Sequence, residues 1–303
     1  MTKNNRKKAV AQAISTAVAL CWAIMQVESA QAATLTVNNL NDSGVGSLRD
    51  TINMATSNDV VEFLLGNHPS TITLTSGAIA IAKNLTINGP GANLLTITGN
   101  NQFPVFDISA ANVTLYGLGI AGNFNAYNFS NITFTNNTIN GDNVNIDSNL
   151  TLINSTISSK RLVINGGLTG INDSNVTALN SITIGGNLTA YSGNLTISTG
   201  RLDINGGINN SGAAGNITIT ADSVFVRNPG SQVTIPISTV NGNSGQINDS
   251  SNNSGAGGNI ILITHDLLLT RVPEPSAIAG IILAGSLAWL AKKKQAAFRK
   301  AKV

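Results

Sequence analysis

The sequence predicts an all-β protein whose body is a right-handed, single-stranded parallel β-helix, a solenoid in which each turn of the chain is one repeat. Three consecutive blocks begin at Arg161, Ser181 and Arg201, and each carries two alternating aliphatic residues followed by a glycine pair. Each segment alternates apolar and polar residues over four to six positions, which is the period of a strand rather than of a helix. Gly, Asn or Asp closes each segment, and these residues turn the chain at little conformational cost.

The recurrence of apolar residues indicates how the strands pack. Leu162, Ile182 and Leu202 occupy equivalent places in the three blocks, twenty residues apart. One repeat has too few apolar residues to close a core, so we expect the repeats to stack at about 4.8 Å and to bury these residues as one column. Recurrent turn asparagines are expected to form amide ladders along the stack. An antiparallel β-sandwich also has short, evenly spaced strands, but it does not require one side-chain type every twenty residues.

Residues 1–32 have the organisation of a secretory signal peptide, which we expect to be helical. Cations within residues 3–8 precede a mostly small and apolar stretch over residues 9–27. Ala30 and Ala32 fit the small-x-small pattern of a cleavage site, so the mature chain is expected to start near Ala33. The single cysteine, Cys21, lies inside this segment, and the mature body therefore has neither a disulfide framework nor thiolate metal ligands.

Residues 33–66 are expected to cap the first turn of the solenoid, because an open end would expose the core. The pattern predicts a strand over residues 34–37 and another over residues 59–64. Between them, Ser47 and Asp50 have the spacing of a capping box, which predicts a short helix that ends near Thr56. Residues 67–270 are assigned to the β-helix repeats.

Residues 271–303 contain three parts in a fixed order. A proline-rich motif, an apolar run over residues 276–291 and a basic end follow one another. The motif residues are Val272, Pro273, Glu274 and Pro275, and the first basic residues are Lys292, Lys293 and Lys294. The apolar run would form a helix of roughly 24 Å, just short of the thickness of a bilayer's hydrocarbon core. The cations are expected to stop transfer and to stay cytoplasmic, so the body would lie across the membrane.

This three-part layout closely resembles the PEP-CTERM sorting signal of exported bacterial proteins, whose diagnostic tetrapeptide is Val-Pro-Glu-Pro. The resemblance implies export by the Sec machinery and anchoring through a C-terminal transmembrane sorting helix. It further implies processing near Pro273–Pro275 by an exosortase-type transpeptidase, after which the body would be on the cell surface or extracellular. An ordinary single-pass tail anchor is the alternative interpretation of the same hydropathy.

The body carries a second resemblance. Asn-Asp-Ser-Gly-x-Gly-Ser-Leu-Arg, at residues 41–49, is similar to the entry motif of bacterial surface β-helix proteins, and the repeats from residue 160 onward resemble filamentous-haemagglutinin-type and pectin-lyase-like β-helices. The resemblance implies the fold more firmly than an activity. We expect a non-catalytic role in adhesion or in an extracellular matrix or biofilm, with extracellular polysaccharide or a cell surface as partner.

The charge of the mature body excludes one class of partner. The whole chain has a formal charge of +3, but most of its cations lie in the two terminal segments. Residues 33–270 hold six Lys or Arg against twelve Asp or Glu, which is a net charge of −6, and they show no basic stripe. Nucleic-acid binding is therefore not expected.

Catalysis is the main alternative, since pectin-lyase-like folds include polysaccharide lyases and glycosidases. A lyase requires clustered acids for calcium, and a glycosidase requires two carboxylates at a set separation. Asp142 and Asp147 are five positions apart, which would place them on opposite faces of a strand. His68 and His265 are expected to be solvated residues rather than metal ligands. We therefore predict no catalytic residues, no metal site and no cofactor.

Threonines that alternate along a strand suggest a ligand face. Thr71, Thr73 and Thr75 are expected to share one face of a strand, and further pairs show the same alternation. These pairs are Thr96 with Thr98, Thr133 with Thr135, and Thr218 with Thr220. Stacked rows of this kind would hold glycans or order water, so ice or glycan binding is a further alternative. The simplest interpretation is that Thr suits a solvent-facing strand.

Overall fold

The computed structural model describes residues 31–210, 216–226 and 260–269. The chain divides into two compact units, residues 1–33 and residues 34–303, and the second contains every described helix and strand. The predicted sorting motif at residues 272–275, the apolar run and Lys292–Lys294 lie outside the described residues, as does Ala30 of the predicted cleavage site. Among the residues that are described, no helix is both long and apolar enough to span a membrane.

Two parallel sheets make up the described chain. Sheet A contains β1 (Thr34–Val37), β2 (Val60–Phe63), β5 (Leu85–Asn88), β8 (Val113–Tyr116), β11 (Ile132–Thr135), β13 (Leu150–Ile153), β15 (Leu168–Ile171), β17 (Leu188–Ser192) and β19 (Ile208–Asn210). Sheet B contains β3 (Ser70–Thr73), β4 (Ile79–Ile81), β6 (Leu95–Thr98), β7 (Phe106–Ser109), β9 (Gly119–Ala121), β10 (Phe124–Tyr127), β12 (Thr138–Ile146), β14 (Thr156–Ile164), β16 (Ser174–Ile184), β18 (Leu195–Ile204), β20 (Ile217–Val226) and β21 (Ile260–Leu269).

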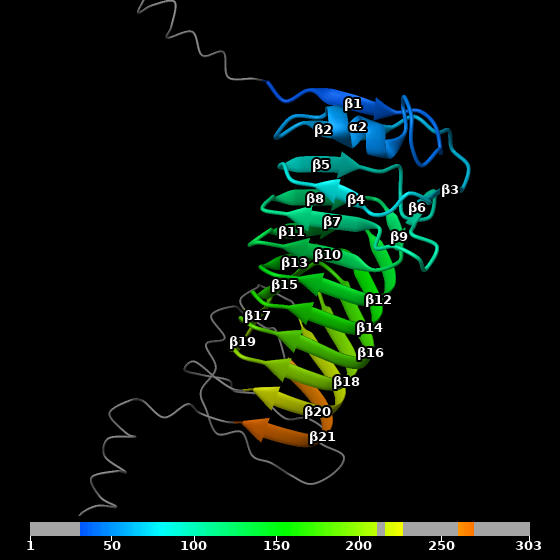
Figure 1. The fold of residues 1–303 in the computed structure, drawn as a ribbon. Coiled ribbons are helices and arrows are strands. Elements are labelled where there is room, and N and C mark those ends of the chain that lie inside the picture. Colours follow the sequence, from blue (N-terminus) through cyan, green and yellow to red (C-terminus); the bar gives the residue numbers. More distant parts are fainter. Residues whose placement is uncertain (1–30, 211–215, 227–259, 270–303) are drawn as a thin grey trace, which may run out of the picture. The chain divides into compact units, whose positions relative to one another are not determined.

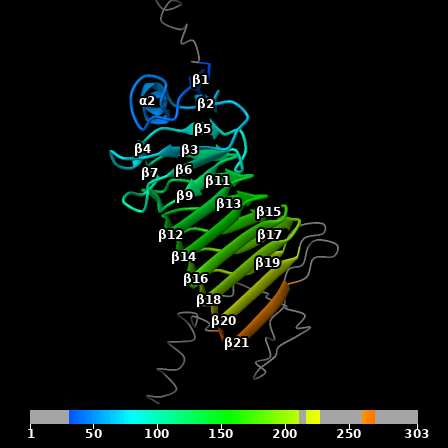
Figure 2. The same cartoon turned by 90° about the vertical axis from the view of Figure 1, so that its right-hand side faces the viewer.

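Sheet B has two faces that merge at β12. Strands β3, β6 and β9 lead into the first half of β12, whereas β4, β7 and β10 lead into its second half. We call these the leading face and the trailing face, and β12, β14, β16, β18 and β20 contribute to both. Successive strands follow one another from β1 to β21 (Figure 1), and the strands of sheets A and B form separate columns (Figure 2).

All strand pairs within the described residues are parallel, which confirms a β-solenoid and excludes the antiparallel sandwich. Leu162 pairs in register with Ile182, and Ile182 pairs with Leu202. Each of the three is fully buried. The predicted aliphatic column is therefore confirmed, and Val144 and Val224 extend it in both directions.

The core is aliphatic along most of the stack and aromatic over a few successive strands, where Phe106 and Phe124 are paired on neighbouring strands. Phe106 and Phe124 meet edge to face with their ring centroids 6.1 Å apart, and Phe124 meets Phe134 in the same way at 5.2 Å. Phe134 belongs to sheet A and the other two to the trailing face, so the rings fill the space between the sheets. Such pairs add about 1 kcal/mol each beyond the area that they bury.

Amide ladders occur where they were predicted, but on two different edges. Asn131 Nδ2 donates to Asn112 Oδ1 at 2.9 Å, and Asn149 Nδ2 donates to Asn131 Oδ1 at 3.4 Å, just before the strands of sheet A. Asn216 Nδ2 donates to Asn194 Oδ1 at 3.1 Å, just before strands of sheet B. An asparagine followed by an aliphatic residue and threonine thus begins strands on either sheet.

The corner after sheet A depends on residues that tolerate a positive φ. Asn136, Asn154 and Asn172 have φ of 54°, 47° and 52°, and Gly117 and Gly193 take the equivalent places at the two ends of this row. Asparagine adopts this left-handed conformation more readily than other residues with a Cβ. Asn154 Nδ2 also donates to Asn136 Oδ1 at 2.8 Å, so one residue type supplies both the turn and the ladder.

The strand, short helix and strand that were predicted for the cap segment are present as β1, α2 (Leu48–Met54) and β2. Helix α2 follows Ser47, whose side chain accepts a hydrogen bond from the Asp50 N–H, and it ends two residues before the predicted Thr56. Lys83 Nζ donates to the carbonyls of Ile52, Asn53 and Ala55 at 3.1, 3.2 and 2.7 Å. This lysine satisfies free carbonyls at the helix C-terminus and offsets the negative end of its dipole.

A carboxylate joins the cap to the first turn. Asp42 accepts hydrogen bonds from Arg49 at 2.7 Å and from the backbone and side chains of Thr75 and Ser76. Burial by itself raises the pKa of Asp42, but the hydrogen bonds from Ser76, Arg49 and Thr75 outweigh it and hold the pKa well below its ordinary value of 3.8.

Candidate functional site

The leading face of sheet B displays two adjacent columns of residues, and most of their side chains are small and polar. The first column consists of Thr71, Thr96, Gly119, Thr138, Thr156, Asn175, Thr196 and Thr218. The second column consists of Thr73, Thr98, Ala121, Asn140, Ser158, Thr177, Ser198 and Thr220. Neighbours are about 4.8 Å apart between strands and about 6.6 Å apart along a strand. We call this surface the polar array.

The predicted threonines divide among three places. Thr71 and Thr73 lie on β3 at the start of the polar array, both exposed. Thr75 lies beyond the end of β3, where its N–H and hydroxyl each donate to Asp42 at 3.1 Å, so it helps to join the first turn to the cap instead. The pairs on β6 and β20 lie in the polar array, whereas Thr133 and Thr135 lie on β11 of sheet A.

Sheet A carries a threonine column that sequence reasoning missed as a stack. Its members are Thr86, Thr114, Thr133, Thr151, Thr169 and Thr189, each paired in register with the next. Five of these, all except Thr169, follow an asparagine and an aliphatic residue, so the signal was present in the sequence. The strand order was needed to show that they belong to one column.

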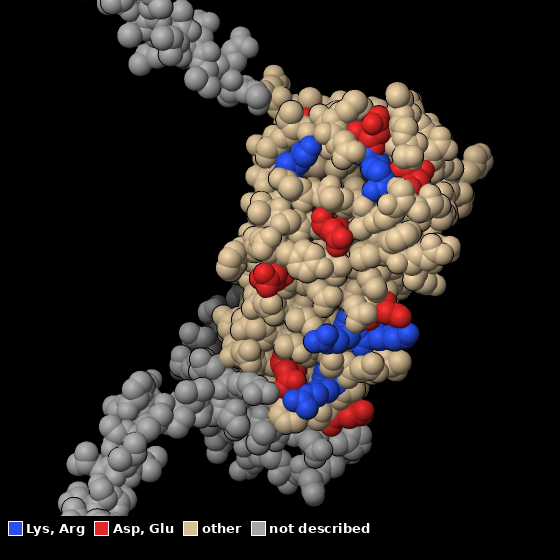
Figure 3. Space-filling model, in the orientation of Figure 1, with Lys and Arg blue, Asp and Glu red and all other residues tan. Residues whose placement is uncertain are grey.

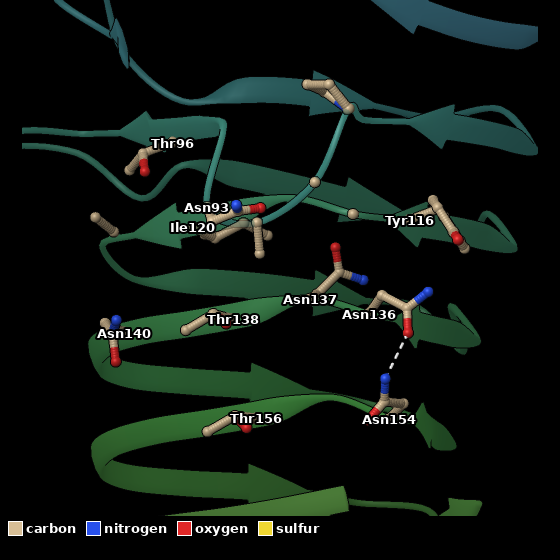
Figure 4. Close-up of a pocket in the computed structure, with 16 residues that line it drawn as sticks. Asn93, Thr96, Tyr116, Ile120, Asn136, Asn137, Thr138, Asn140, Asn154 and Thr156 are labelled. Carbon is tan, nitrogen blue, oxygen red and sulfur yellow. Dashed lines mark hydrogen bonds between the residues drawn. The ribbon is translucent and has the colours of Figure 1, made fainter. Parts of the chain in front are cut away.

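The polar array is interrupted at β9, and a cavity lies there. Gly119 and Ala121 replace the two polar side chains of that strand, and they lie between β6 and β12. The cavity has a volume of about 580 Å³, within the range of small-molecule sites. Residues 90–93 of the loop after β5 form one wall, and Figure 4 shows Thr96 and Asn140 toward one end and Tyr116 toward the other.

The cavity is electrically neutral. None of its lining residues is Asp, Glu, Lys, Arg or His. In the described ranges, ion pairs join Arg49 to Asp42, Lys160 to Asp142 and Arg201 to Asp203 at 2.7, 2.9 and 2.7 Å. Charged side chains are sparse and of mixed sign on the surface that Figure 3 displays. An anionic or cationic ligand therefore finds no opposite charge in the cavity.

The acidic residues considered for catalysis have other partners. Asp142 is exposed on β12 and pairs with Lys160. Asp147 follows β12, where it accepts hydrogen bonds from the Asn165 side chain at 2.7 Å and from the Asn128 N–H at 3.2 Å. Over the part of the chain that the structure covers, no three His, Cys, Asp or Glu residues lie close enough together to hold a metal ion. His68 is exposed in the loop before β3.

The fold and surface define a parallel β-solenoid whose leading face is polar and uncharged and is interrupted by a cavity at β9. The family models, the curated proteins and the solved structures each gave no match to this chain. Function is therefore inferred from the terminal sequence signals and from the chemistry of the solenoid surface.

Proposed function

We propose that the chain is an exported, surface-sorted β-helix protein that acts without catalysis in adhesion or in building an extracellular matrix or biofilm. Export by the Sec machinery, guided by residues 1–32, would bring the body across the membrane. The apolar run over residues 276–291 would anchor it as a transmembrane helix until an exosortase-type transpeptidase cuts near Val272–Pro275. The mature right-handed β-helix would then reach the cell surface or the medium.

The observation that carries this proposal is the repetition of one neutral polar surface over strands β3 to β20. A repeated surface presents many equivalent weak contacts, so that binding gains through multivalency rather than through one tight site. A rigid stack of parallel strands suits this role because its core column and amide ladders hold every repeat in the same orientation. Extracellular polysaccharide and neighbouring cell surfaces are the partners that this chemistry fits.

The sorting step has a direct test in the native host. The intact mass and the cell fraction are measured for the wild-type chain and for a variant that combines Pro273→Ala, Glu274→Ala and Pro275→Ala. The wild type is expected as a product that ends near Pro275 in the surface or medium fraction, while the variant stays full length in the membrane. A control with Ser250→Ala, Ser251→Ala and Ser254→Ala should be processed normally. Full-length wild type retained in the inner membrane contradicts the proposal.

Two other functions have distinct readouts. A carbohydrate-active enzyme would cleave pectin, alginate or related polymers, with or without calcium. Measurable turnover would contradict the non-catalytic role and support this enzymatic one. The regular spacing of the polar array also favours ordered water as a ligand, and thermal hysteresis measures ice binding directly. Thr177→Lys on the array should abolish such activity, whereas Thr169→Lys on sheet A should preserve it.

A further inference from the structure

We propose that the cavity at β9 is a binding site for an uncharged glycan segment. This inference rests on the proposed surface function and narrows it, because it assigns recognition to one place on the solenoid and to one chemical class of ligand. Four observations support it: the gap in the polar array, the neutral lining, the side-chain groups left open for a ligand, and an exposed aromatic ring.

The gap exists because Gly119 and Ala121 have small side chains or none and because the loop of residues 90–93 packs closely against β9. A Cβ at position 119 would lie 3.0 Å from both the Ala92 carbonyl oxygen and the Thr96 hydroxyl, so Gly119 lets the loop approach the strand. Gly117, with a φ of 58°, has the Gly89 carbonyl oxygen 2.9 Å from the place of a Cβ. The wall and the floor are thus fixed by backbone contacts, and the site is formed before any ligand binds.

The polar groups around this floor suit hydroxyl ligands. Asn93, Thr138, Asn140 and Thr156 make no side-chain hydrogen bond to any other described residue, and all four line the cavity. Amides and hydroxyls both donate and accept, as do the hydroxyls of a sugar. Because carboxylates and cations are absent from the lining, the same groups would leave a uronic acid, a phosphate or a metal ion without a charged partner.

A rigid amide pair and an aromatic ring lie at the other end. Asn154 Nδ2 donates to Asn136 Oδ1 at 2.8 Å, which orients both amides and leaves Asn136 Nδ2 and Asn154 Oδ1 for a ligand (Figure 4). Tyr116 is 40% exposed beside them, and its ring supplies an apolar face next to polar groups. Asn137 also lines the cavity, but its amide is already bonded to the Leu118 N–H and the Leu115 carbonyl.

The test uses the full chain in detergent micelles whose headgroups contain no sugar. Isothermal titration calorimetry measures binding of neutral gluco-, manno- and galacto-oligosaccharides, with oligogalacturonate as the charged comparison. At least one neutral oligosaccharide is expected to bind, and oligogalacturonate is expected to bind at least tenfold more weakly. Failure of every neutral probe, or preference for oligogalacturonate, overturns the proposal.

Matched variants locate the site. Tyr116→Ala and Ala121→Gln should each weaken binding of the neutral oligosaccharide at least tenfold, since the first removes the ring and the second fills the gap. Tyr127→Ala and Ser158→Gln are the controls, because Tyr127 is 43% exposed on β10 and Ser158 continues the column of Ala121 outside the cavity. Circular dichroism of each variant checks the fold. Equal effects of the controls and the cavity variants overturn the assignment.

Binding by the cavity variants and attachment of cells that lack the protein test the cavity assignment and the adhesive role separately. If Tyr116→Ala and Ala121→Gln lose no affinity while cells lacking the whole protein attach poorly, the cavity assignment fails and the adhesive role stands. If the variants lose affinity but deletion of the protein leaves attachment and matrix unchanged, the site stands and the adhesive role fails.

Discussion

Truncation of one core residue tests the stack of repeats most directly. Ile182 is fully buried between Leu162 and Leu202, its partners on the two neighbouring strands. Ile182→Ala removes three carbons, worth about 2.4 kcal/mol in transfer free energy. The neighbours cannot close the void, because backbone hydrogen bonds keep the strands about 4.8 Å apart, so a cavity cost adds to this loss. We expect a loss of about 4 kcal/mol in the free energy of unfolding.

Thr183→Ala is the matched control, since Thr183 is the next residue of β16 and is only partly buried. Urea unfolding followed by circular dichroism compares the two variants, with the loss at Thr183 expected below about 1 kcal/mol. Because each repeat contacts its nearest neighbours, amide hydrogen exchange should show lost protection in β14 and β18 before β5.

The reasoning is refuted if Ile182→Ala and Thr183→Ala cost the same. It is also refuted if the Ile182 variant loses protection equally in β5 and in β14, because a stacked column must transmit the defect to its nearest neighbours first.

Asp42→Asn should cost about 2 kcal/mol, because it weakens the hydrogen bonds that join the cap to the first turn. Because the pKa of Asp42 is lowered in the folded state, the stability that its carboxylate contributes is complete above the ordinary pKa of 3.8 and is lost as the pH falls below that value. The urea midpoint should therefore decline less between pH 7 and pH 3 in Asp42→Asn than in the wild type. Lys83→Met should cost about 1 kcal/mol in thermal unfolding through loss of the α2 C-terminal contacts, whereas the exposed Lys160→Met should cost less than about 0.5 kcal/mol. Asn154→Ala should lower the free energy of unfolding, measured by urea titration, by about 2 kcal/mol, and Asn154→Gly should lower it clearly less. Both variants lose the hydrogen bond to Asn136, but glycine adopts the positive φ without strain. Equal losses in the two variants would contradict this explanation.

The aliphatic column could be predicted because a stacked core imposes a strict rule on sequence. Each turn must place an apolar residue above the last one, so Leu162, Ile182 and Leu202 recur at a constant interval where the turns are equally long. Earlier turns differ in the length of their loops, such as the one over residues 89–94. The same stacking occurs there, but it has no constant period that sequence inspection can detect.

The candidate site was predicted in part. Alternating threonines correctly indicated the outward faces of β3, β6 and β20, because side chains two apart share one side of a strand. The role of Thr75 was not predictable, since its partner Asp42 lies 33 residues away in the sequence. The cavity was not predicted because its floor consists of Gly119 and Ala121, which have no polar side-chain group that would indicate a binding site.

The sequence by itself determined that this chain forms strands, that they stack as repeats, and that asparagine builds the turns and ladders. These properties depend on the alternation of apolar and polar residues within a segment and on the recurrence of aliphatic residues from one repeat to the next, and both patterns are visible along the chain. Only the tertiary structure decided which strands share a sheet, which threonines form one surface, and where that surface opens into a cavity. Those properties depend on neighbours from different turns, and variable loop lengths hide their alignment until the backbone hydrogen bonds set the register.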